Sequence, residues 1–442
     1  MPGQDVLSIL PRSVVHPPVA HGDLLRSGLV RGDLAVIVDG YYHQSASVRH
    51  KEILALLAGG VVVVGCASMG ALRAAELAEY GMVGTGTVFR MYRDGVLDAD
   101  DEVAVAHGPA PDYRSFTVPL VVVRHAADLL VGLGEIDETD AASIVDLARD
   151  IHYTERSWRA IRVAAEEAGS VNLAAQARLC DFVTAHPEVA DVKVMDTVDT
   201  LRKIACGELP AEQHSGDSWR SGDWRNRYID EWQAEFTIST VDEIEVSDSA
   251  VVRYQQLYLD DFPTRWERFV LRVITGTDGA DGRTDDLAAR ALSIATRSGL
   301  RSSMSAGRAY WLTSAEVAEL TDDQALLRML VRSYEPLRPT RDLLDDQPDL
   351  VEDATARRVV AEATVANAEI ASWADKQTVD HLKPAVLRTH LAEVWRVDGS
   401  DEAAVLAAAR DRGFVSIDAA ITAARMFFLY KSFVTVGPER TG

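Results

Sequence analysis

The sequence predicts an α/β core domain built on a parallel sheet, followed by a large and mainly α-helical region. Two observations carry this prediction. Up to about residue 134, short runs rich in β-branched residues alternate with segments that have helical spacing. Beyond about residue 135, the chain changes to long segments rich in Ala, Leu, Arg and Glu, which are typical of amphipathic helices. We therefore expect the core domain over residues 1–135 and the helical region over residues 136–442.

The predicted core alternates strands and helices along the chain. Strands are expected at residues 5–10 (DVLSIL), 33–40 (DLAVIVDG) and 61–65 (VVVVG), and helices at residues 48–60 (VRHKEILALLAGG) and after Ser68. Continuous apolar strands of this kind are usually buried on both faces, as in a parallel sheet covered by helices. This order predicts a Rossmann-like parallel sheet.

The helical region contains segments that are opened by Ser, Thr or Asp residues, which are favourable N-caps. The clearest segments are residues 142–153, 157–169, 286–299, 314–334 and 400–414. Polar stretches at residues 212–227 and 335–349 interrupt them and predict linkers or exposed loops. A break near residues 335–350 would divide the region into two subdomains.

Charge and cysteine content narrow the class of protein. The chain carries 45 basic and 68 acidic side chains, and the formal net charge of −23 repels phosphate backbones and anionic membranes, so we expect neither as a partner. No apolar run approaches the ~20 residues of a membrane span, and the three cysteines lie far apart. These features predict a cytoplasmic protein. We also expect no metal and no cofactor, because no cluster has metal-ligand spacing and VGTGTVF at residues 83–89 lacks the third glycine of a dinucleotide-binding loop.

The turn GCASMG, between a predicted strand and a predicted helix, carries the first candidate residue, Ser68. A serine at a helix start is a favoured N-cap, and the pattern alone favours this interpretation. A serine at a sharp strand-to-helix turn also resembles a nucleophile elbow, although Cys66 stands where the elbow has glycine. In a third interpretation, the unpaired amides at Met69 and Gly70 hold an anion.

Cys66 and Arg73 flank this serine. A thiol beside a helix N-terminus can be nucleophilic, but a cysteine that ends a valine strand is more often a small core residue, and we favour the core. Arg73 and Glu76 are three residues apart, which predicts a surface ion pair. Alternatively, Arg73 reaches an anion held at the turn.

A second group of candidates follows the strand expected at residues 33–40. Asp39, Gly40 and Tyr41 stand at its end, where parallel-sheet proteins place ligand loops. His43 and His50 come next along the chain and could line the same crevice.

A third group lies between residues 89 and 109. Arg93 and Asp94 precede a glycine and predict a turn, and the acidic run at residues 98–102 predicts a solvated loop. His107 follows a β-branched stretch and could orient or activate Ser68.

An ordered series of motifs runs through residues 14–130: HPPVAHGDLL, DGYY, HKEI, SMGALRAAEL, GMVG, YRDG, DDEVAV and HGP. This series resembles the core domain of the TfuA-like proteins. The resemblance implies an accessory role in the backbone thioamidation of ribosomal peptides, a branch of natural product biosynthesis. In such systems a YcaO enzyme uses ATP to activate an amide oxygen, and a TfuA partner helps to supply the sulfur. The implied partners are a YcaO protein, a thiocarboxylated ThiS-like sulfur carrier protein and a precursor peptide.

The reaction that the resemblance implies suggests chemical roles for the candidates, which we assign by chemistry. Release of sulfide from a thiocarboxylate is an acyl transfer, which needs a nucleophile or an activated water, a base and donors for the oxyanion. Ser68 would be the nucleophile, and His50 or His107 the base. The residues assigned to substrate binding are Asp39, Gly40, Tyr41, Met69, Gly70, Arg73, Arg93 and Asp94.

Three hypotheses of function stay open at this stage. The first is a thiocarboxylate hydrolase that releases sulfide for a YcaO enzyme. The second is a non-catalytic partner that recruits or activates YcaO, motivated by the helical region and by the Trp- and Arg-bearing loop at residues 212–227. The third is a serine hydrolase that acts on an unrelated substrate.

Overall fold

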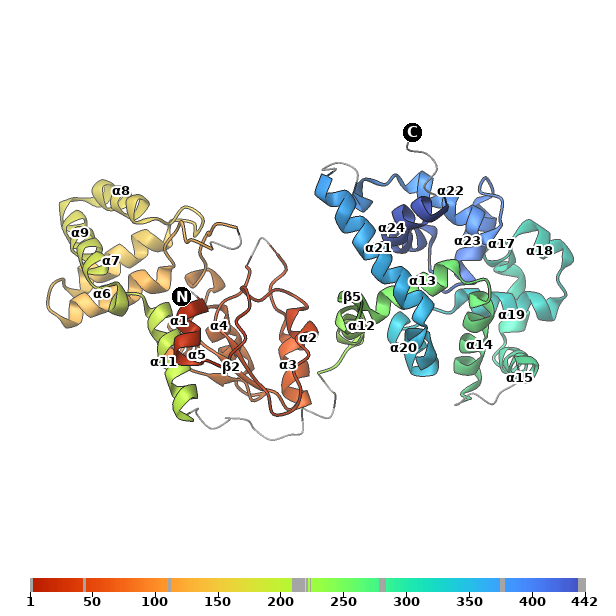
Figure 1. Ribbon diagram of the computed structural model, residues 1–442, viewed down its shortest axis with the longest axis horizontal. Coiled ribbons are helices and arrows are strands. Elements are labelled where there is room, and N and C mark those ends of the chain that lie inside the picture. Colours follow the sequence, from red (N-terminus) through yellow and green to blue (C-terminus); the bar gives the residue numbers. More distant parts are fainter. Residues whose placement is uncertain are drawn as a thin grey trace. The chain divides into compact units, whose positions relative to one another are not determined.

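The computed structural model describes residues 3–42, 45–109, 113–208, 219, 222, 224–277, 284–373 and 378–435. The chain divides into two compact units, Met1–Arg225 and Asn226–Gly442 (Figure 1). The predicted core of residues 1–135 is therefore one part of the first unit, which also takes in the helices that follow it. A finer division at residue 135, or near residues 335–350 within the second unit, stays a prediction.

A three-stranded parallel sheet forms the centre of the first unit, in the order β1-β2-β3. Its strands are β1 (Leu34–Ile37), β2 (Val62–Gly65) and β3 (Val83–Gly84). Ile37 pairs with Gly65 and Gly65 pairs with Gly84, so the carboxyl ends of the strands meet at one edge. Valines at the middle of β2 are fully buried, which explains the continuous valine run. Both strands that the valine-rich runs predicted are confirmed.

Helices connect these strands in the predicted alternation. They are α3 (His50–Gly59) between β1 and β2, α4 (Met69–Leu77) between β2 and β3, and α5 (Gly86–Arg93) after β3. Glu52 fixes the start of α3, because its buried carboxylate accepts hydrogen bonds from the backbone N–H groups of Arg49 and Gly22. Gly60 ends this helix with a φ of 85°, a left-handed conformation that favours glycine. The α/β fold class is therefore confirmed.

The prediction of a strand at residues 5–10 is wrong, since residues Gly3–Ile9 form a helix, α1. Val6, Ile9 and Leu10 are partly buried, whereas Leu7 between them is exposed. This spacing of three and four residues is the helical period, and α1 packs against α11. The apolar run was too short for β-branched content alone to decide between the two structures.

The first unit continues into a cluster of helices with its own apolar core. After α2 (Asp23–Arg26) and the 3-10 helix η1 (Asp100–Glu102), the helices are α6 (Leu120–Gly132), α7 (Glu138–Arg149), α8 (Trp158–Ala168), α9 (Ser170–Ala185), α10 (Pro187–Ala190) and α11 (Val192–Cys206). Figure 1 shows α6, α7, α8 and α9 gathered together. Leu120, Ile144 and Ile161, from three of these helices, are buried in one cluster. Ser157 caps α8 by accepting a hydrogen bond from Ala160 N–H, as expected.

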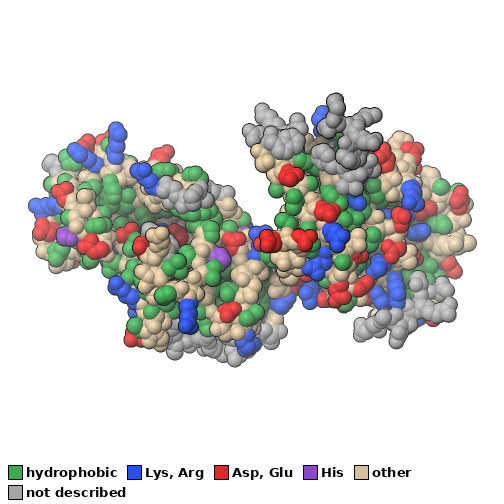
Figure 2. All heavy atoms as spheres, in the orientation of Figure 1, with side chains coloured by type: hydrophobic (Ala, Val, Ile, Leu, Met, Phe, Trp, Pro, Cys, Tyr) green, Lys and Arg blue, Asp and Glu red, His purple; other side chains and the backbone are tan. Residues whose placement is uncertain are grey.

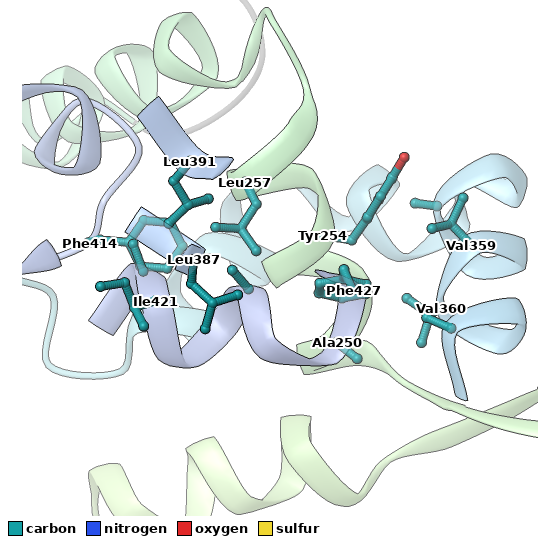
Figure 3. Close-up of a cluster of buried hydrophobic side chains, with 14 of the residues drawn as sticks. Ala250, Tyr254, Leu257, Val359, Val360, Leu387, Leu391, Phe414, Ile421 and Phe427 are labelled. Carbon is teal, nitrogen blue, oxygen red and sulfur yellow. The ribbon is translucent and has the colours of Figure 1, made fainter. Parts of the chain in front are cut away.

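The second unit is mainly helical. Its elements are α12 (Arg227–Phe236), β4 (Ile238–Val241), β5 (Ile244–Ser247), α13 (Asp248–Tyr258), α14 (Phe262–Thr275), α15 (Thr284–Arg297), α16 (Leu300–Ser303), η3 (Met304–Ala306), α17 (Arg308–Trp311), α18 (Ser314–Glu319), α19 (Asp322–Ser333), α20 (Pro339–Asp346), η4 (Pro348–Glu352), α21 (Ala354–Trp373), η5 (Val379–His381), α22 (Pro384–Trp395), α23 (Glu402–Arg410) and α24 (Ile417–Thr435). The segment expected as one helix at residues 314–334 is two helices, because Thr321 and Gln324 form a capping box that starts α19. Figure 3 shows Leu257 of α13, Leu391 of α22 and Phe427 of α24 in one buried cluster.

The antiparallel hairpin of β4 and β5 was not predicted. Asp242 and Glu243 make its two-residue turn with φ angles of 48° and 68°, the backbone conformation of a type I′ turn. A glycine in the turn is the strongest sequence signal for such hairpins, and this turn has none.

The surface of each unit carries both signs of charge. Figure 2 shows Asp and Glu side chains beside Lys and Arg side chains over both units. Among the described helices, none combines the length and the apolar character that a membrane crossing requires.

Candidate functional site

A small pocket opens where the parallel strands end, at the edge of the sheet where such folds place ligands. Its volume is about 90 Å³. It is lined by Pro18, Asp39, Gly40, Tyr42, Ser68, Met69, Asp100, Val103, Ala104, Val105, His107, Tyr113 and Ser115. Apart from Pro18, the walls come from the loop after β1, the turn after β2, and η1 with the segment that follows it.

The turn after β2 holds Ser68 against this pocket without using its hydroxyl as a cap. Ser68 is the N-cap residue of α4, but its side chain makes no capping hydrogen bond and finds no hydrogen-bond partner among the described residues. Its exposed fraction is only 2 %. The favoured interpretation of Ser68 as a side-chain cap is thus wrong, and its hydroxyl is left available to the pocket.

The backbone of this turn is strained. Ser68 N–H donates to Cys66 O at 2.7 Å, and the residue between them, Ala67, has a φ of 67°. A hydrogen bond between residues two apart around a positive φ is a γ-turn of the rare kind. Non-glycine residues in this region cost roughly 1–3 kcal/mol and cluster at functional sites. In this turn the strained position is Ala67, not Ser68 as in a nucleophile elbow.

Two glycines allow α4 to start directly over the sheet. A Cβ at Gly70 would lie 1.7 Å from Ile37 O, and a Cβ at Gly65 would lie 2.0 Å from Gly70 O. Gly70 N–H donates to Val38 O at 3.3 Å, so this predicted anion donor is already engaged. Met69 N–H has no hydrogen-bond partner among the described residues and remains available at the pocket wall.

His107 lines the same pocket, and one nitrogen of its ring contacts the backbone. Its Nδ1 lies 2.7 Å from Gly108 O, and because a carbonyl oxygen can only accept, Nδ1 carries the proton. Neutral His107 then presents the lone pair of Nε2, which has no partner within the described part of the chain. The rings of Tyr41 and Tyr113 lie 6.0 and 5.7 Å from that of His107. His107 therefore lines the same pocket as Ser68, and Tyr41 lies beside its ring rather than in the pocket lining.

Two acidic side chains, Asp39 and Asp100, also line this pocket. Asp39 Oδ1 accepts a hydrogen bond from Gly40 N–H, and its Oδ2 lies 3.7 Å from Lys193 Nζ. Asp100 accepts a hydrogen bond of 2.6 Å from the hydroxyl of Tyr42. Burial, together with this bond to a carboxylate, raises the pKa of Tyr42. An anionic ligand would meet these two acidic side chains.

His50 and Arg73 are not among the residues that line the pocket. His50 Nε2 lies 2.8 Å from Glu76 Oε2, and an Arg73 nitrogen lies 2.6 Å from the same oxygen. Burial acts to raise the pKa of Glu76, but the hydrogen bonds from His50 and Arg73 outweigh it and lower that pKa. The local ion pair expected between Arg73 and Glu76 is confirmed, and both His50 and Arg73 contact Glu76 rather than the pocket.

Arg93 and Asp94 are also outside the pocket lining. They form an exposed ion pair with each other at 2.8 Å, at the end of α5. His43, the remaining histidine of the predicted crevice, lies outside the described residues, as does most of the loop at residues 212–227.

The acidic run at residues 98–102 is not simply a solvated loop. Glu102 is 3 % exposed and accepts two hydrogen bonds from Arg124 at 2.7 and 2.9 Å. Asp101 pairs with the fully buried Arg156 at 3.3 Å. These pairs join η1 to α6 and to the connection between α7 and α8, and so hold the wall that carries His107.

Cys66 is a core residue, as favoured from the sequence. Its side chain is fully buried, and burial raises the pKa of its thiol to about 12, although a hydrogen bond with Thr200 opposes the shift. A thiol in this state is not a nucleophile near neutral pH.

The glycine-rich segment at residues 83–89 also has a structural explanation. The carboxylate of Asp196, on α11, accepts hydrogen bonds from Thr87 N–H and Val88 N–H at 2.7 and 2.8 Å. A Cβ at Gly86 would lie 2.4 Å from the carboxyl carbon of Asp196. The N-terminus of α5 is thus satisfied by a side chain of the chain itself.

The sequence interpretation missed several residues of the site. Tyr42 and Tyr113 line the pocket but were not singled out, and Asp100 was counted only in the acidic run. Tyr42 directly follows Tyr41, and Asp100 and Tyr113 lie within seven residues of His107 in the sequence, which is the signal that could have found them. Lys193 follows the pocket motifs by about 90 residues, and nothing in its own segment indicates a site.

Comparison with known proteins adds one finding to this geometry. Residues 39–157 match the model of the family described as TfuA-like protein. The match confirms the resemblance seen in the motifs, and it includes Asp39, Ser68 and His107. It ends before α11 and covers no part of the second unit. No curated protein matches the chain.

Proposed function

From the match of residues 39–157 to the TfuA-like family, we propose that the chain is an accessory protein in the backbone thioamidation of ribosomal peptides, acting with a YcaO enzyme. In this role it hydrolyses the C-terminal thiocarboxylate of a ThiS-like sulfur carrier protein and releases sulfide. One observation supports this most. Along one pocket, the Ser68 hydroxyl and the Nε2 of His107 both lack a hydrogen-bond partner among the described residues.

The proposed chemistry is an acyl transfer in two steps. Nε2 of His107 takes the proton of the Ser68 hydroxyl as its oxygen attacks the thiocarboxylate carbon. The oxygen of the tetrahedral intermediate accepts a hydrogen bond from Met69 N–H at the start of α4. The C–S bond then breaks, and sulfide leaves with the proton from His107. Water, activated by the same nitrogen, hydrolyses the ester on Ser68, so that a thiocarboxylate and water give a carboxylate and hydrogen sulfide.

The direct test is sulfide release from thiocarboxylated carrier protein. We expect His107→Gln to lower kcat by about 10²–10⁴-fold, the usual contribution of a general base, and Ser68→Ala to lower it at least as much. Ser8→Ala is a matched control, because Ser8 is an exposed serine of α1 whose hydroxyl donates to Asp5 O. Circular dichroism of each variant checks that the fold is kept.

The two other hypotheses, a non-catalytic partner and a serine hydrolase of another substrate, predict different results for the wild type and these variants. If Ser68→Ala releases sulfide at the wild-type rate, the catalytic role is wrong. If the protein instead raises YcaO turnover when free sulfide is supplied, it is a non-catalytic partner. Labelling of Ser68 by a fluorophosphonate, together with ester hydrolysis and no sulfide release, would indicate a serine hydrolase of another substrate.

A further inference from the structure

Helix α11 lies beyond the family match, yet it is bound firmly to the core of the first unit. Asp196 holds the N-terminus of α5, as described above. One turn further along α11, the hydroxyl of Thr200 lies 2.6 Å from that of Thr85, and both side chains are buried. Because these contacts fix the helix in place, the side chain at its first turn has a defined position against the sheet.

That side chain is Lys193, and it contacts two walls of the pocket. Its ammonium group donates to Val103 O at 3.0 Å and lies 3.7 Å from Asp39 Oδ2. Only 15 % of the lysine side chain is exposed, against 44 % for Asp39. Asp39 belongs to the loop after β1, and Val103 belongs to the segment that leads to His107, so a single cation joins both.

The charge of this lysine matters because the described residues that line the pocket include two aspartates and no lysine or arginine. Asp39 and Asp100 both line it, and the proposed ligand ends in a thiocarboxylate, which is an anion. Like charges at these separations repel, and the repulsion is screened less in a partly buried site than in water. A hydroxyl from Tyr42 is the hydrogen-bond donor to Asp100, whereas Asp39 has a full positive charge beside it.

We propose that Lys193 is a positioning residue of the pocket, which neutralises Asp39 and so allows the anionic end of a ligand to approach Ser68 and His107. The inference rests on the proposed function for the identity of that ligand. It extends the working site beyond the matched residues 39–157 to α11.

Alkylation of His107 measures the charge of the pocket without any turnover. Iodoacetate is an anion and iodoacetamide is its neutral counterpart of similar size. With either reagent, Nε2 of His107 forms a bond to the CH₂ carbon and iodide leaves, so the ratio of the two rates isolates the effect of reagent charge. Peptide mapping by mass spectrometry separates His107 from Cys206, which is exposed.

We expect Lys193→Gln to lower the iodoacetate-to-iodoacetamide ratio at His107 about three- to tenfold, the effect of removing one nearby charge at a partly exposed site. Lys193→Arg should keep the ratio, because it keeps the charge. Asp39→Asn in the Lys193→Gln background should restore it, since the uncompensated carboxylate is then gone. Lys203→Gln, an exposed lysine on the same helix, is the matched control and should change nothing.

Three results would overturn the inference. They are an unchanged ratio in Lys193→Gln, a lowered ratio that Asp39→Asn does not restore, and a wild-type His107 that reacts with neither reagent. The second result would mean that the lysine acts through packing rather than charge.

Steady-state kinetics of sulfide release distinguish a failure of this inference from a failure of the proposed function. If the wild type releases sulfide, Lys193→Gln should raise KM for the thiocarboxylated carrier about three- to tenfold and leave kcat within about twofold. An unchanged KM then contradicts the role of Lys193 while the hydrolase stands. If the wild type releases no sulfide but the alkylation ratio changes as expected, the hydrolase proposal fails and the charge role of Lys193 stands.

Discussion

At the scale of single residues, the turn after β2 places the thiol of Cys66 in the core and the hydroxyl of Ser68 at the pocket. Cys66 is fully buried in the core, and Ser68, two residues later, lines the pocket. The positive φ of Ala67 between them reverses the chain over a single residue. The thiol of Cys66, which is intrinsically the stronger nucleophile, is therefore the group that cannot react.

This arrangement predicts a wide difference in thiol reactivity. In the folded protein at pH 8, we expect Cys66 to react with iodoacetamide at least about 10³-fold more slowly than the exposed Cys206. Burial both raises the pKa of the Cys66 thiol to about 12 and blocks access to it. Timed labelling with peptide mapping gives the two rates, and in denaturant they should converge. Similar rates in the folded protein would contradict the core assignment.

At the scale of elements, the sequence predicted the order of strands and helices where a long apolar pattern existed. The apolar runs of β1 and β2 and the helical spacing of α3 and α4 left little ambiguity. The six residues at 5–10 were misassigned because so short a run fits both periods, and contact with α11 decides in favour of a helix. The split between α18 and α19 depended on a capping box, a local signal that was present in the sequence but not used.

The contact between α4 and β1 makes a sharp prediction about glycine. Gly70→Ala places a Cβ 1.7 Å from Ile37 O, a backbone atom that cannot move without shifting the strand. We expect it to lower the free energy of unfolding by about 3 kcal/mol or more, or to prevent folding. Gly59→Ala is the control, because a Cβ at Gly59 meets no atom within 4 Å. That variant should be neutral or more stable by up to about 1 kcal/mol. Chemical denaturation of the full chain measures both, and equal stability of the two variants would contradict the close packing described here.

The candidate site was predictable only in part, for a reason that also lies at this scale. Asp39, Ser68 and His107 stand in motifs near the ends of strands or in the segment beside them, and parallel topology brings such ends together. His50 and Arg73 belong to the same motifs, but their side chains pair with Glu76. No periodicity distinguishes a helix residue that faces a pocket from one that faces its neighbour. The position of Lys193 beside the pocket results from tertiary contacts alone, so no local sequence pattern predicts it.

At the scale of the whole molecule, the family match and the folded unit have different extents. The match ends at residue 157, whereas the first compact unit runs to Arg225. The segment between these two ends contains helices α8 to α11, and α11 supplies Asp196 and Lys193 to the core. The second unit has its own buried clusters.

We therefore predict that residues 1–225 fold alone and keep the wild-type alkylation ratio at His107, whereas residues 1–157 do not fold stably. Without residues 158–225, the buried helical core loses Ile161 and Leu179, and burial of a side chain of this kind contributes about 1.5–3 kcal/mol. The start of α5 also loses the carboxylate that accepts hydrogen bonds from two of its N–H groups. Losses of this size together approach the total stability of a typical domain. Cooperative thermal unfolding of each fragment, followed by circular dichroism, gives the answer. A cooperative transition in the shorter fragment, at the same temperature as in the longer one, would show that the matched segment is self-sufficient. Asp196→Ala in the full chain then serves as the single-residue control, because it removes the acceptor of both N–H groups and leaves the rest of α11 in place.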